Sequence, residues 1–219
     1  MAKRDGKLAV ITGTASGIGA ATRALFEQAG VSVVGIDIKD AEIIADLSTK
    51  AGRESAIAGV KQHCGGSIDS FVVCAGLATY ARPISLIPSV NYFGAIDLLD
   101  GVFELLKRGR DPAAVAILSN AALMMPPDES PYVQALLNHD EGGAWRILTE
   151  FEEADGLLLA SGHAYMGSKF ALGRALRQPI SILKLKHRIS RSISSLFSGS
   201  GLISLALGIL RPRRTLPSV

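Results

Sequence analysis

The sequence TGTASGIG, at Thr12–Gly19, follows an apolar, β-branched run at Lys7–Thr12 and precedes a helix-like segment at Ile18–Ala29. A short apolar run that ends at glycine is typical of a buried strand. Gly30 is a usual stop signal at the C-terminal end of a helix. The beginning of the chain therefore predicts a strand, a tight glycine-rich turn and a helix, in that order.

The glycines of this turn suit the binding of a dinucleotide. They permit a tight turn and a close approach of the backbone to a pyrophosphate, and the following helix offers free N–H groups and its positive dipole end to the phosphates. The expected cofactor contacts are Gly13, Ser16, Gly17, Ile18 and Gly19. The spacing Gly-x-x-x-Gly-x-Gly is weak evidence alone, because a purely structural turn has the same pattern. Its position between a strand and a helix strengthens it.

The segments beyond the turn alternate between strand-like and helix-like residues. Strands are expected at Val31–Asp37, Glu42–Leu47, Ile68–Cys74 and Ala113–Ser119, and helices at Lys50–Gln62 and Ser89–Lys107. Strands that alternate with helices imply parallel crossover connections. We therefore predict an α/β fold with a doubly wound, Rossmann-type parallel sheet.

Asp37 stands at the end of the second expected strand, 18 residues after Gly19. A carboxylate there can accept hydrogen bonds from both hydroxyls of an adenosine ribose, and it would repel a 2′-phosphate, which favours NAD over NADP. No Arg lies near Asp37 in the sequence, although Lys39 is close. The alternative is a solvated turn aspartate. Asp46 and Leu47 could line the adenine, or Asp46 could be a turn or helix N-terminal residue.

Tyr165 and Lys169 are four residues apart, which places them on one face of a helix. A free tyrosine, with a pKa of about 10, is a poor base at neutral pH, but a nearby ammonium favours the phenolate. Such a tyrosine can take a proton from an alcohol or give one to a carbonyl. The pattern is common and mostly without meaning alone. Together with the glycine turn it indicates hydride transfer between a nicotinamide and a carbonyl or alcohol.

These motifs resemble the short-chain dehydrogenase/reductase family, and within it the 3α-hydroxysteroid dehydrogenase/carbonyl reductase subgroup. The resemblance covers about Lys7–Arg177. It rests on Thr12–Gly19, Gly35–Ile38, Cys74–Gly76, Val90–Ala95 and Tyr165–Lys169. The long segment between the fifth expected strand and the tyrosine is also a mark of the subgroup.

The resemblance implies catalytic roles. Ser119 matches the serine that hydrogen-bonds the substrate oxygen, and Asn91 matches the asparagine that kinks a helix and holds a water linking Lys169 to solvent. Tyr165 matches the acid/base, and Lys169 its partner and the holder of the nicotinamide ribose. Ser119 could instead merely cap a strand end, and Asn91 a helix. Asn120 stands where many relatives carry another serine.

The segment Cys74-Ala75-Gly76 matches a family motif usually written Asn-Ala-Gly, which lies against the cofactor. The cysteine is a departure from the pattern, but it is small, and we expect it to be buried. Ala75 and Gly76 are expected cofactor contacts, and so is Ile38, which follows Asp37.

A helical insertion is expected at Ala121–Ser161, with helices at Tyr132–Asn138 and Ala144–Ala160 and a loop at Met124–Pro127. It could be a substrate lid, a subunit contact or a packed excursion with no special role. Trp145, Phe151 and the Leu157–Leu159 run are apolar enough to need a partner surface. We assign residues 1–177, with this insertion, to the cofactor-binding domain.

The chain changes character at about Gln178. From Gly156 onward there is no Asp or Glu and there are ten Lys or Arg, so this stretch carries +10 and the rest of the chain −7. Pro179 would break a continuing helix. The basic and apolar tail, residues 178–219, reads like translation in another frame or an alternative terminus.

Members of the family continue with a sixth strand, a Pro-Gly turn, a substrate-covering loop and a seventh strand. None is legible here, so we expect the last two strands to be missing, the fifth to become an edge, and turnover to be weak. Ser192–Leu210 is uncharged and could instead span a bilayer, lie at its interface or form a makeshift strand through Gly201–Leu210. Its serines and glycines disfavour insertion.

Composition limits the remaining possibilities. The two cysteines, Cys64 and Cys74, fit neither a zinc pattern nor a disulfide framework and are expected to be reduced. We expect no metal and no nucleic-acid partner, and structural or solvated roles for the four histidines, although His163 could touch a ligand. The first expected strand begins near Lys7, which leaves no room for a signal peptide and favours the cytoplasm.

We therefore predict an NAD-dependent oxidoreductase that interconverts a secondary alcohol and a ketone, such as a hydroxysteroid or another carbonyl compound. A homo-oligomer would fit the resemblance. The alternatives are a catalytically impaired, cofactor-binding or membrane-attached relative, and a non-functional product of a damaged reading frame.

Overall fold

A single six-stranded sheet organises the computed structural model, which describes residues 6–124, 130–177 and 207–210. Its strand order is β3-β2-β1-β4-β5-β6. The strands are β1 (Leu8–Thr12), β2 (Ser32–Asp37), β3 (Ile43–Ile44), β4 (Ser70–Val73), β5 (Ala113–Ile117) and β6 (Leu207–Leu210). The first five are mutually parallel, so the predicted α/β fold is confirmed.

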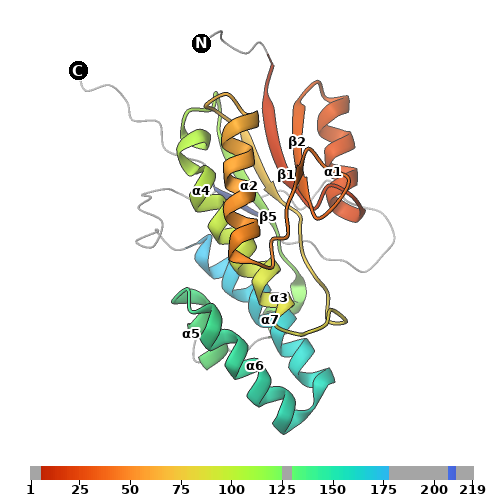
Figure 1. Cartoon of the computed structure of the whole chain (residues 1–219), viewed down its shortest axis with the longest axis vertical. Coiled ribbons are helices and arrows are strands. Elements are labelled where there is room, and N and C mark those ends of the chain that lie inside the picture. The colour runs from red at the N-terminus through yellow and green to blue at the C-terminus, as the bar shows by residue number, and fades with distance from the viewer. Residues whose placement is uncertain (1–5, 125–129, 178–206, 211–219) are drawn as a thin grey trace, which may run out of the picture.

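Helices follow each of the parallel strands except β2 (Figure 1). They are α1 (Gly17–Gln28), α2 (Lys50–His63), α3 (Leu86–Pro88), the π-helical turn η1 (Ser89–Gly94), α4 (Ala95–Lys107), the 3₁₀ turn η2 (Asn120–Met124), α5 (Pro131–Leu137), α6 (Glu141–Asp155) and α7 (Leu157–Ala175). Helices α5 and α6 form a separate layer beyond one end of the sheet, where they pack against α7 (Figure 1).

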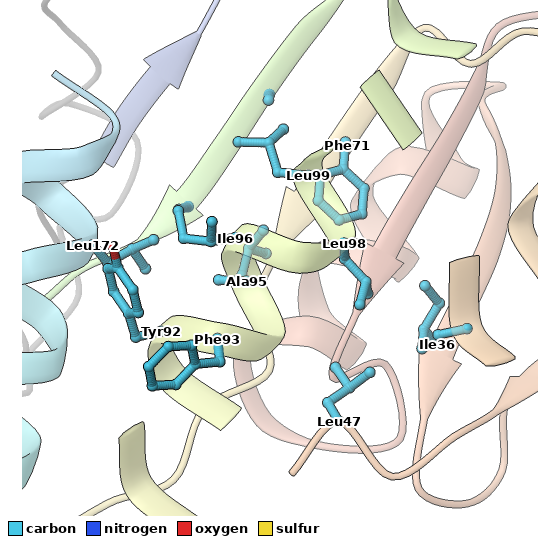
Figure 2. Packing of buried hydrophobic residues seen from close by; sticks show 14 of the residues in the cluster. Ile36, Leu47, Phe71, Tyr92, Phe93, Ala95, Ile96, Leu98, Leu99 and Leu172 are labelled. Atoms are coloured by element: carbon cyan, nitrogen blue, oxygen red, sulfur yellow. The ribbon is translucent and has the colours of Figure 1, made fainter. Parts of the chain in front are cut away.

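Strand β1 is buried along its whole length, and apolar from Leu8 to Ile11, because helices cover both of its faces. Leu8 and Val10 point into the larger core, which is completed by α2, α4 and α7, whereas Ala9 and Ile11 point into a smaller core that includes Phe26 of α1. Figure 2 shows the larger core, in which residues of η1 and α4 fill the space between the sheet and α7. Such continuous apolar strands are typical of a parallel sheet that is buried on both sides.

Two predicted helices have different boundaries in the structure. The segment Ser89–Lys107 is not one α-helix, because its first turn is the π-helical η1. The segment Ala144–Ala160 is also wrong as one helix. Gly156 has a φ of +82°, which ends α6, and α7 starts at the next residue. Only glycine enters this backbone region without strain.

The prediction that the fifth strand is an edge is wrong. Strand β6 pairs with β5 in antiparallel register, from Ala114 opposite Leu210 to Ile117 opposite Leu207. Backbone pairing therefore covers the edge of β5, and β6 corresponds to the makeshift strand considered for Gly201–Leu210. It is not a parallel continuation of the sheet. The other expectations for residues 178–206 and 211–219, including a bilayer span, lie outside the described residues, as does most of the Met124–Pro127 loop.

The insertion is anchored to the sheet layer by buried contacts. The Tyr132 hydroxyl of α5 donates to the Ala164 carbonyl of α7, at 3.1 Å, and the Trp145 indole donates to Ser89 Oγ, at 3.0 Å. The ring of His163 stacks on Phe151, with centroids 4.5 Å apart, so this histidine has a packing role. The insertion is thus a packed unit, and roles as a lid or subunit contact stay predictions.

Arg53 of α2 adds an ionic link between the layers. Its side chain is 3% exposed, and its guanidinium lies 2.7 Å from the carboxylate of Asp97 on α4 and 2.6 Å from that of Glu141 on α6. His139 Nε2 lies 2.9 Å from the other oxygen of Asp97. The hydrogen bond with Asp97 raises the pKa of His139, although burial opposes the shift.

We expect the substitution Arg53→Met to lower the free energy of unfolding by about 3 kcal/mol, because it leaves two carboxylates without their buried partner. Urea unfolding would measure the loss. Lys50→Met is the matched control on the same helix, since the Lys50 side chain is 82% exposed and its partner Glu54 is 4.0 Å away. It should change stability by less than about 0.5 kcal/mol. Equal effects of the two substitutions would contradict an anchoring role for Arg53.

Within the part of the chain that the structure describes, no helix has both the length and the apolar character needed to cross a membrane.

Candidate functional site

The glycine-rich turn packs so tightly that side chains are excluded from it. A Cβ on Gly13 would lie 2.7 Å from the backbone nitrogen of Ala75, and one on Gly19 would lie 1.9 Å from the Gly13 carbonyl oxygen. Gly17 has a φ of +55° and faces open space. The predicted glycines therefore bring β1, α1 and the segment after β4 together, and leave the entrance of α1 accessible.

The N-terminal end of α1 has neither a side-chain cap from Ser16 nor an acidic residue in its first turn. The first N–H groups of a helix have no intrahelical acceptor, so they can bind an anion. This cradle fits the diphosphate of a dinucleotide. Ser16 and Ile18 are exposed at its rim.

Thr12 holds the segment after β4 against the turn, a role that sequence analysis did not assign. Its hydroxyl oxygen is buried and accepts hydrogen bonds from the backbone nitrogens of Cys74, at 3.1 Å, and Ala75, at 3.0 Å. Its position as the last residue of β1, directly before the glycine-rich turn, was the feature of the sequence that could have indicated this role.

Asp37 lies at the rim of the same turn. One carboxylate oxygen accepts from the Ala15 backbone nitrogen, at 2.9 Å, and the other from that of Ile38, at 2.7 Å. The carboxylate is thus fixed beside the glycine turn, and the Ile38 side chain is exposed.

Asp46 and Leu47 follow β3 and have local partners. Asp46 Oδ1 accepts from both the backbone nitrogen and the hydroxyl of Ser48, which is the turn role considered for it, and the Leu47 side chain is buried in the core. That these two residues line an adenine stays a prediction.

Asn91 is buried in η1 and fixes the loop after β4. Its Oδ1 accepts from the Leu77 backbone nitrogen, at 2.6 Å, and its Nδ2 donates to the Leu77 carbonyl, at 3.0 Å, and to Ser168 Oγ, at 3.3 Å. A π-helical turn in place of regular α-helix often marks a functional site. The residue therefore joins the loop to α7 rather than merely capping a helix, and Ser168 is a partner that sequence analysis missed.

Lys169 places its ammonium at the carboxyl ends of β4 and β5. Its Nζ donates to the Ile117 carbonyl, at 3.0 Å. A Cβ on Gly76 would lie 3.2 Å from this Nζ and 3.3 Å from Asn91 Oδ1, so these polar atoms flank Gly76 closely. Burial lowers the pKa of Lys169 to about 8. Burial also raises the pKa of the neighbouring Cys74 thiol to about 11, so the thiol stays protonated at neutral pH.

A cavity of about 350 Å³ lies beside this ammonium. Its lining includes Ser119 and Asn120 after β5, and Lys169 and Arg174 of α7. The Ser119 hydroxyl oxygen accepts from the Ala121 backbone nitrogen, at 3.2 Å. The cavity thus brings Ser119 and Lys169 together. Tyr165 is half-buried one helical turn earlier on α7, outside the residues that line this cavity.

An arginine far from Asp37 in the sequence shares a cavity with a hydrogen-bond partner of Asp37. Arg23 of α1 shares a shallow cavity with Ala15, whose backbone nitrogen binds Asp37. Its guanidinium donates to both carboxylate oxygens of Glu42, at 2.9 and 2.6 Å. This pair was not predictable from local sequence patterns, because nineteen residues separate its members.

Comparison with known proteins gives a consistent result. The family described as short chain dehydrogenase matches residues 7–135. A 3-alpha-hydroxysteroid dehydrogenase/carbonyl reductase of Comamonas testosteroni is 47% identical over 77% of this chain and 64% of its own length. A coniferyl-alcohol dehydrogenase of Pseudomonas sp. is 30% identical over 64% of this chain and 55% of its own length.

Solved structures include a similar fold. The 3-alpha-hydroxysteroid dehydrogenase of Pseudomonas sp. B-0831, solved with NADH, is 45% identical and has a TM-score of 0.72, over 79% of this chain and 65% of its own length. This chain therefore spans about two thirds of the length of its two most similar relatives named here. The family match covers more than half of the chain. The chain belongs to the short chain dehydrogenase family.

Proposed function

We propose that this chain binds NAD(H) and interconverts a secondary alcohol and a ketone. In this proposal Tyr165 is the proton donor and acceptor, and the Lys169 ammonium stabilises its phenolate. Ser119 binds the substrate oxygen. Asn91 positions the backbone of Leu77 and the α7 segment that carries Lys169. The geometry of the glycine turn supports the cofactor, and the names of the relatives support hydroxysteroids or related carbonyl compounds as substrates.

The buried ammonium of Lys169 is the observation that carries the proposal. Its side chain is at the carboxyl ends of parallel strands, where ligands of open α/β sheets bind. Among the described residues it has no carboxylate partner, and its ammonium donates a hydrogen bond to the Ile117 carbonyl. A buried cation with a lowered pKa destabilises the fold, so its presence in a cleft favours a functional role.

When bound, NADH would supply the hydride for reduction and NAD⁺ would accept it in oxidation, while residues of the chain transfer the proton. During reduction, the Ser119 hydroxyl donates a hydrogen bond to the substrate carbonyl, and the Tyr165 hydroxyl donates its proton to that oxygen. The Lys169 ammonium stabilises the phenolate that remains. During oxidation, the phenolate takes the proton from the alcohol. One proton and one hydride thus convert a ketone into an alcohol.

Asp37 supports NAD rather than NADP. Its carboxylate is fixed beside the entrance of α1, where it can accept from ribose hydroxyls and repel a 2′-phosphate. The cytoplasm as location and a homo-oligomeric state stay predictions.

We expect the substitution Tyr165→Phe to lower kcat by about a thousandfold while the Kd for NADH stays within about threefold, because it removes only the ionisable hydroxyl. NADH fluorescence titration and NADH-coupled reduction of a 3-ketosteroid by the full chain would measure both quantities. Tyr80→Phe is the matched control, since the Tyr80 side chain is 83% exposed.

The outcomes separate the proposal from its alternative. Unchanged turnover of the Tyr165→Phe variant would contradict the role of the tyrosine. NADH binding by the wild type without any turnover would support a cofactor-binding, catalytically impaired relative instead.

A further inference from the structure

Three polar side chains converge on Gly35, in the middle of β2. A Cβ on this glycine would lie 2.4 Å from Thr14 Oγ1, 3.0 Å from Glu42 Oε2 and 3.1 Å from Arg23 Nη1. Only a glycine leaves room for them. They line a shallow cavity of about 670 Å³ together with Ala15, Asp40 and Ala41.

This cavity adjoins the residues that would hold the adenosine ribose. The backbone nitrogen of Ala15, which lines the cavity, donates to Asp37 Oδ2, so the carboxylate of Asp37 lies next to a residue of the cavity wall. Thr14 Oγ1 is buried and has no hydrogen-bond partner among the residues described. In the proposed binding mode the ribose hydroxyls bind Asp37, so the polar groups of this cavity lie near the 2′ position, where NAD and NADP differ.

The carboxylate of Glu42 pairs with the only cationic side chain that lines this cavity among the described residues, the Arg23 guanidinium. It accepts from two nitrogens of Arg23, at 2.9 and 2.6 Å, and also from the Gly35 backbone nitrogen, at 2.7 Å. The Arg23 hydrogen bond is the largest cause that lowers the pKa of Glu42, so the carboxylate stays ionised at neutral pH. The backbone contact fixes Glu42 to β2, and Glu42 in turn fixes Arg23.

We propose that Glu42 is a specificity-determining residue, which withholds the Arg23 guanidinium from a 2′-phosphate and so helps the site reject NADP(H). A planar guanidinium binds phosphate with two charge-assisted hydrogen bonds, so a free Arg23 beside the ribose would attract NADPH. With Glu42 in place, the charge of Arg23 is neutralised, and the carboxylates of Asp40 in the cavity wall and of Asp37 beside Ala15 disfavour a second anion. This inference rests on the proposed binding of NAD(H) at the glycine turn.

The test is a fluorescence titration of the full chain with NADH and with NADPH. The substitution Glu42→Gln removes the charge but keeps an oxygen that can accept from the Gly35 nitrogen. We expect its Kd for NADPH to fall by about tenfold or more, and its Kd for NADH to stay within about threefold. Adding Arg23→Met to this variant should remove the gain.

Glu27→Gln is the matched control, because Glu27 Oε1 also accepts from Arg23, at 2.9 Å, but has an exposed side chain on α1. It should leave both Kd values within about threefold, as is usual for an exposed ion pair. Glu42→Ala serves as a second variant if Glu42→Gln proves insoluble, and the same gain is expected.

The outcomes distinguish the inference from the proposed function. If the wild type binds NADH but neither Glu42 variant gains affinity for NADPH, the inference is wrong and the proposed function stands. If the gain persists in the double variant with Arg23→Met, the assignment to Arg23 is wrong. If the wild type binds no NADH, the proposed function and the inference both fail.

Discussion

The substitution Lys169→Met should abolish turnover and yet raise the free energy of unfolding. Burial holds the ammonium at a pKa of about 8, which corresponds to a destabilisation of about 3 kcal/mol relative to an exposed lysine. Methionine fills a similar volume without charge, and loss of the hydrogen bond to Ile117 offsets part of the gain. We expect a net increase of about 2 kcal/mol in stability and a fall of about a thousandfold in kcat.

This stability difference should narrow as the pH rises. The folded pKa of about 8 lies below the value of roughly 10.4 for an exposed lysine. Between these values the unfolded chain binds more protons than the folded chain, so wild-type stability rises with pH across this window. Below the folded pKa the cost of the buried charge is full and constant. Unfolding in urea at about pH 7 and about pH 9.5 would measure the change.

Lys61→Met is the control for Lys169→Met, because Lys61 is exposed on α2. Its stability should stay within about 0.5 kcal/mol of the wild type, with full activity. A Lys169→Met variant that is less stable than the wild type at neutral pH would show that the ammonium has stabilising partners and no destabilising burial.

The substitution Gly19→Ala should remove NADH binding and destabilise the fold. The new methyl group would lie 1.9 Å from the Gly13 carbonyl oxygen and 3.2 Å from that of Thr12, and backbone atoms cannot yield as a side chain can. We expect a loss of about 3 kcal/mol in the free energy of unfolding. The displaced turn would also misplace the N–H groups of α1. Thermal unfolding and NADH titration would measure the two effects.

Gly162→Ala on α7 is the matched control, since the nearest atom to its new methyl group would be Met166 Cε, at 3.9 Å. A helical glycine is less favourable than alanine, so this variant should be neutral or slightly more stable, by about 0.5 kcal/mol. Full NADH binding by Gly19→Ala would mean that the turn is not the cofactor cradle.

Local patterns predicted the parts of the fold that depend on neighbours in sequence. The apolar run of β1 and the glycines at Thr12–Gly19 predicted the first strand, turn and helix, because their packing and φ requirements are local. The alternation of apolar segments then implied the parallel order. Asp37 lies beside the turn, as its position at the end of a predicted strand suggested, whereas the place of Lys169 at the carboxyl ends of the strands depends on how α7 packs on the sheet.

Long-range contacts were not predictable from the same patterns. The Arg53–Glu141 pair spans 88 residues, and only folding brings α2 to the insertion. The same holds for Arg23 with Glu42 and for Asn91 with Ser168. Gly156 was overlooked as a helix break because a glycine inside a helical pattern is often tolerated. A strand through Gly201–Leu210 was only one of several alternatives, and its pairing with β5 was not predicted, because edge pairing needs only free backbone groups, which leave little trace in side chains.

The insertion has exposed apolar side chains, which a substrate or a second subunit would cover if the insertion were a lid or a subunit contact. Leu158 and Leu159 on the first turn of α7 are 85% and 63% exposed, whereas Ala160 beside them is fully buried. The buried side of the insertion therefore packs against the core of the same chain.

The most direct test of the central claim is to follow the transfer of the hydride from NADH to the substrate with an isotope label. The full chain would be incubated with NADH that carries deuterium at both C4 positions of the nicotinamide and with a 3-ketosteroid, and the product alcohol would be analysed by mass spectrometry and NMR. We expect one deuterium at the new carbinol carbon in the wild-type reaction, and only traces of product with Tyr165→Phe. Alcohol without deuterium at that carbon, or no alcohol from a chain that demonstrably binds NADH, would contradict the account.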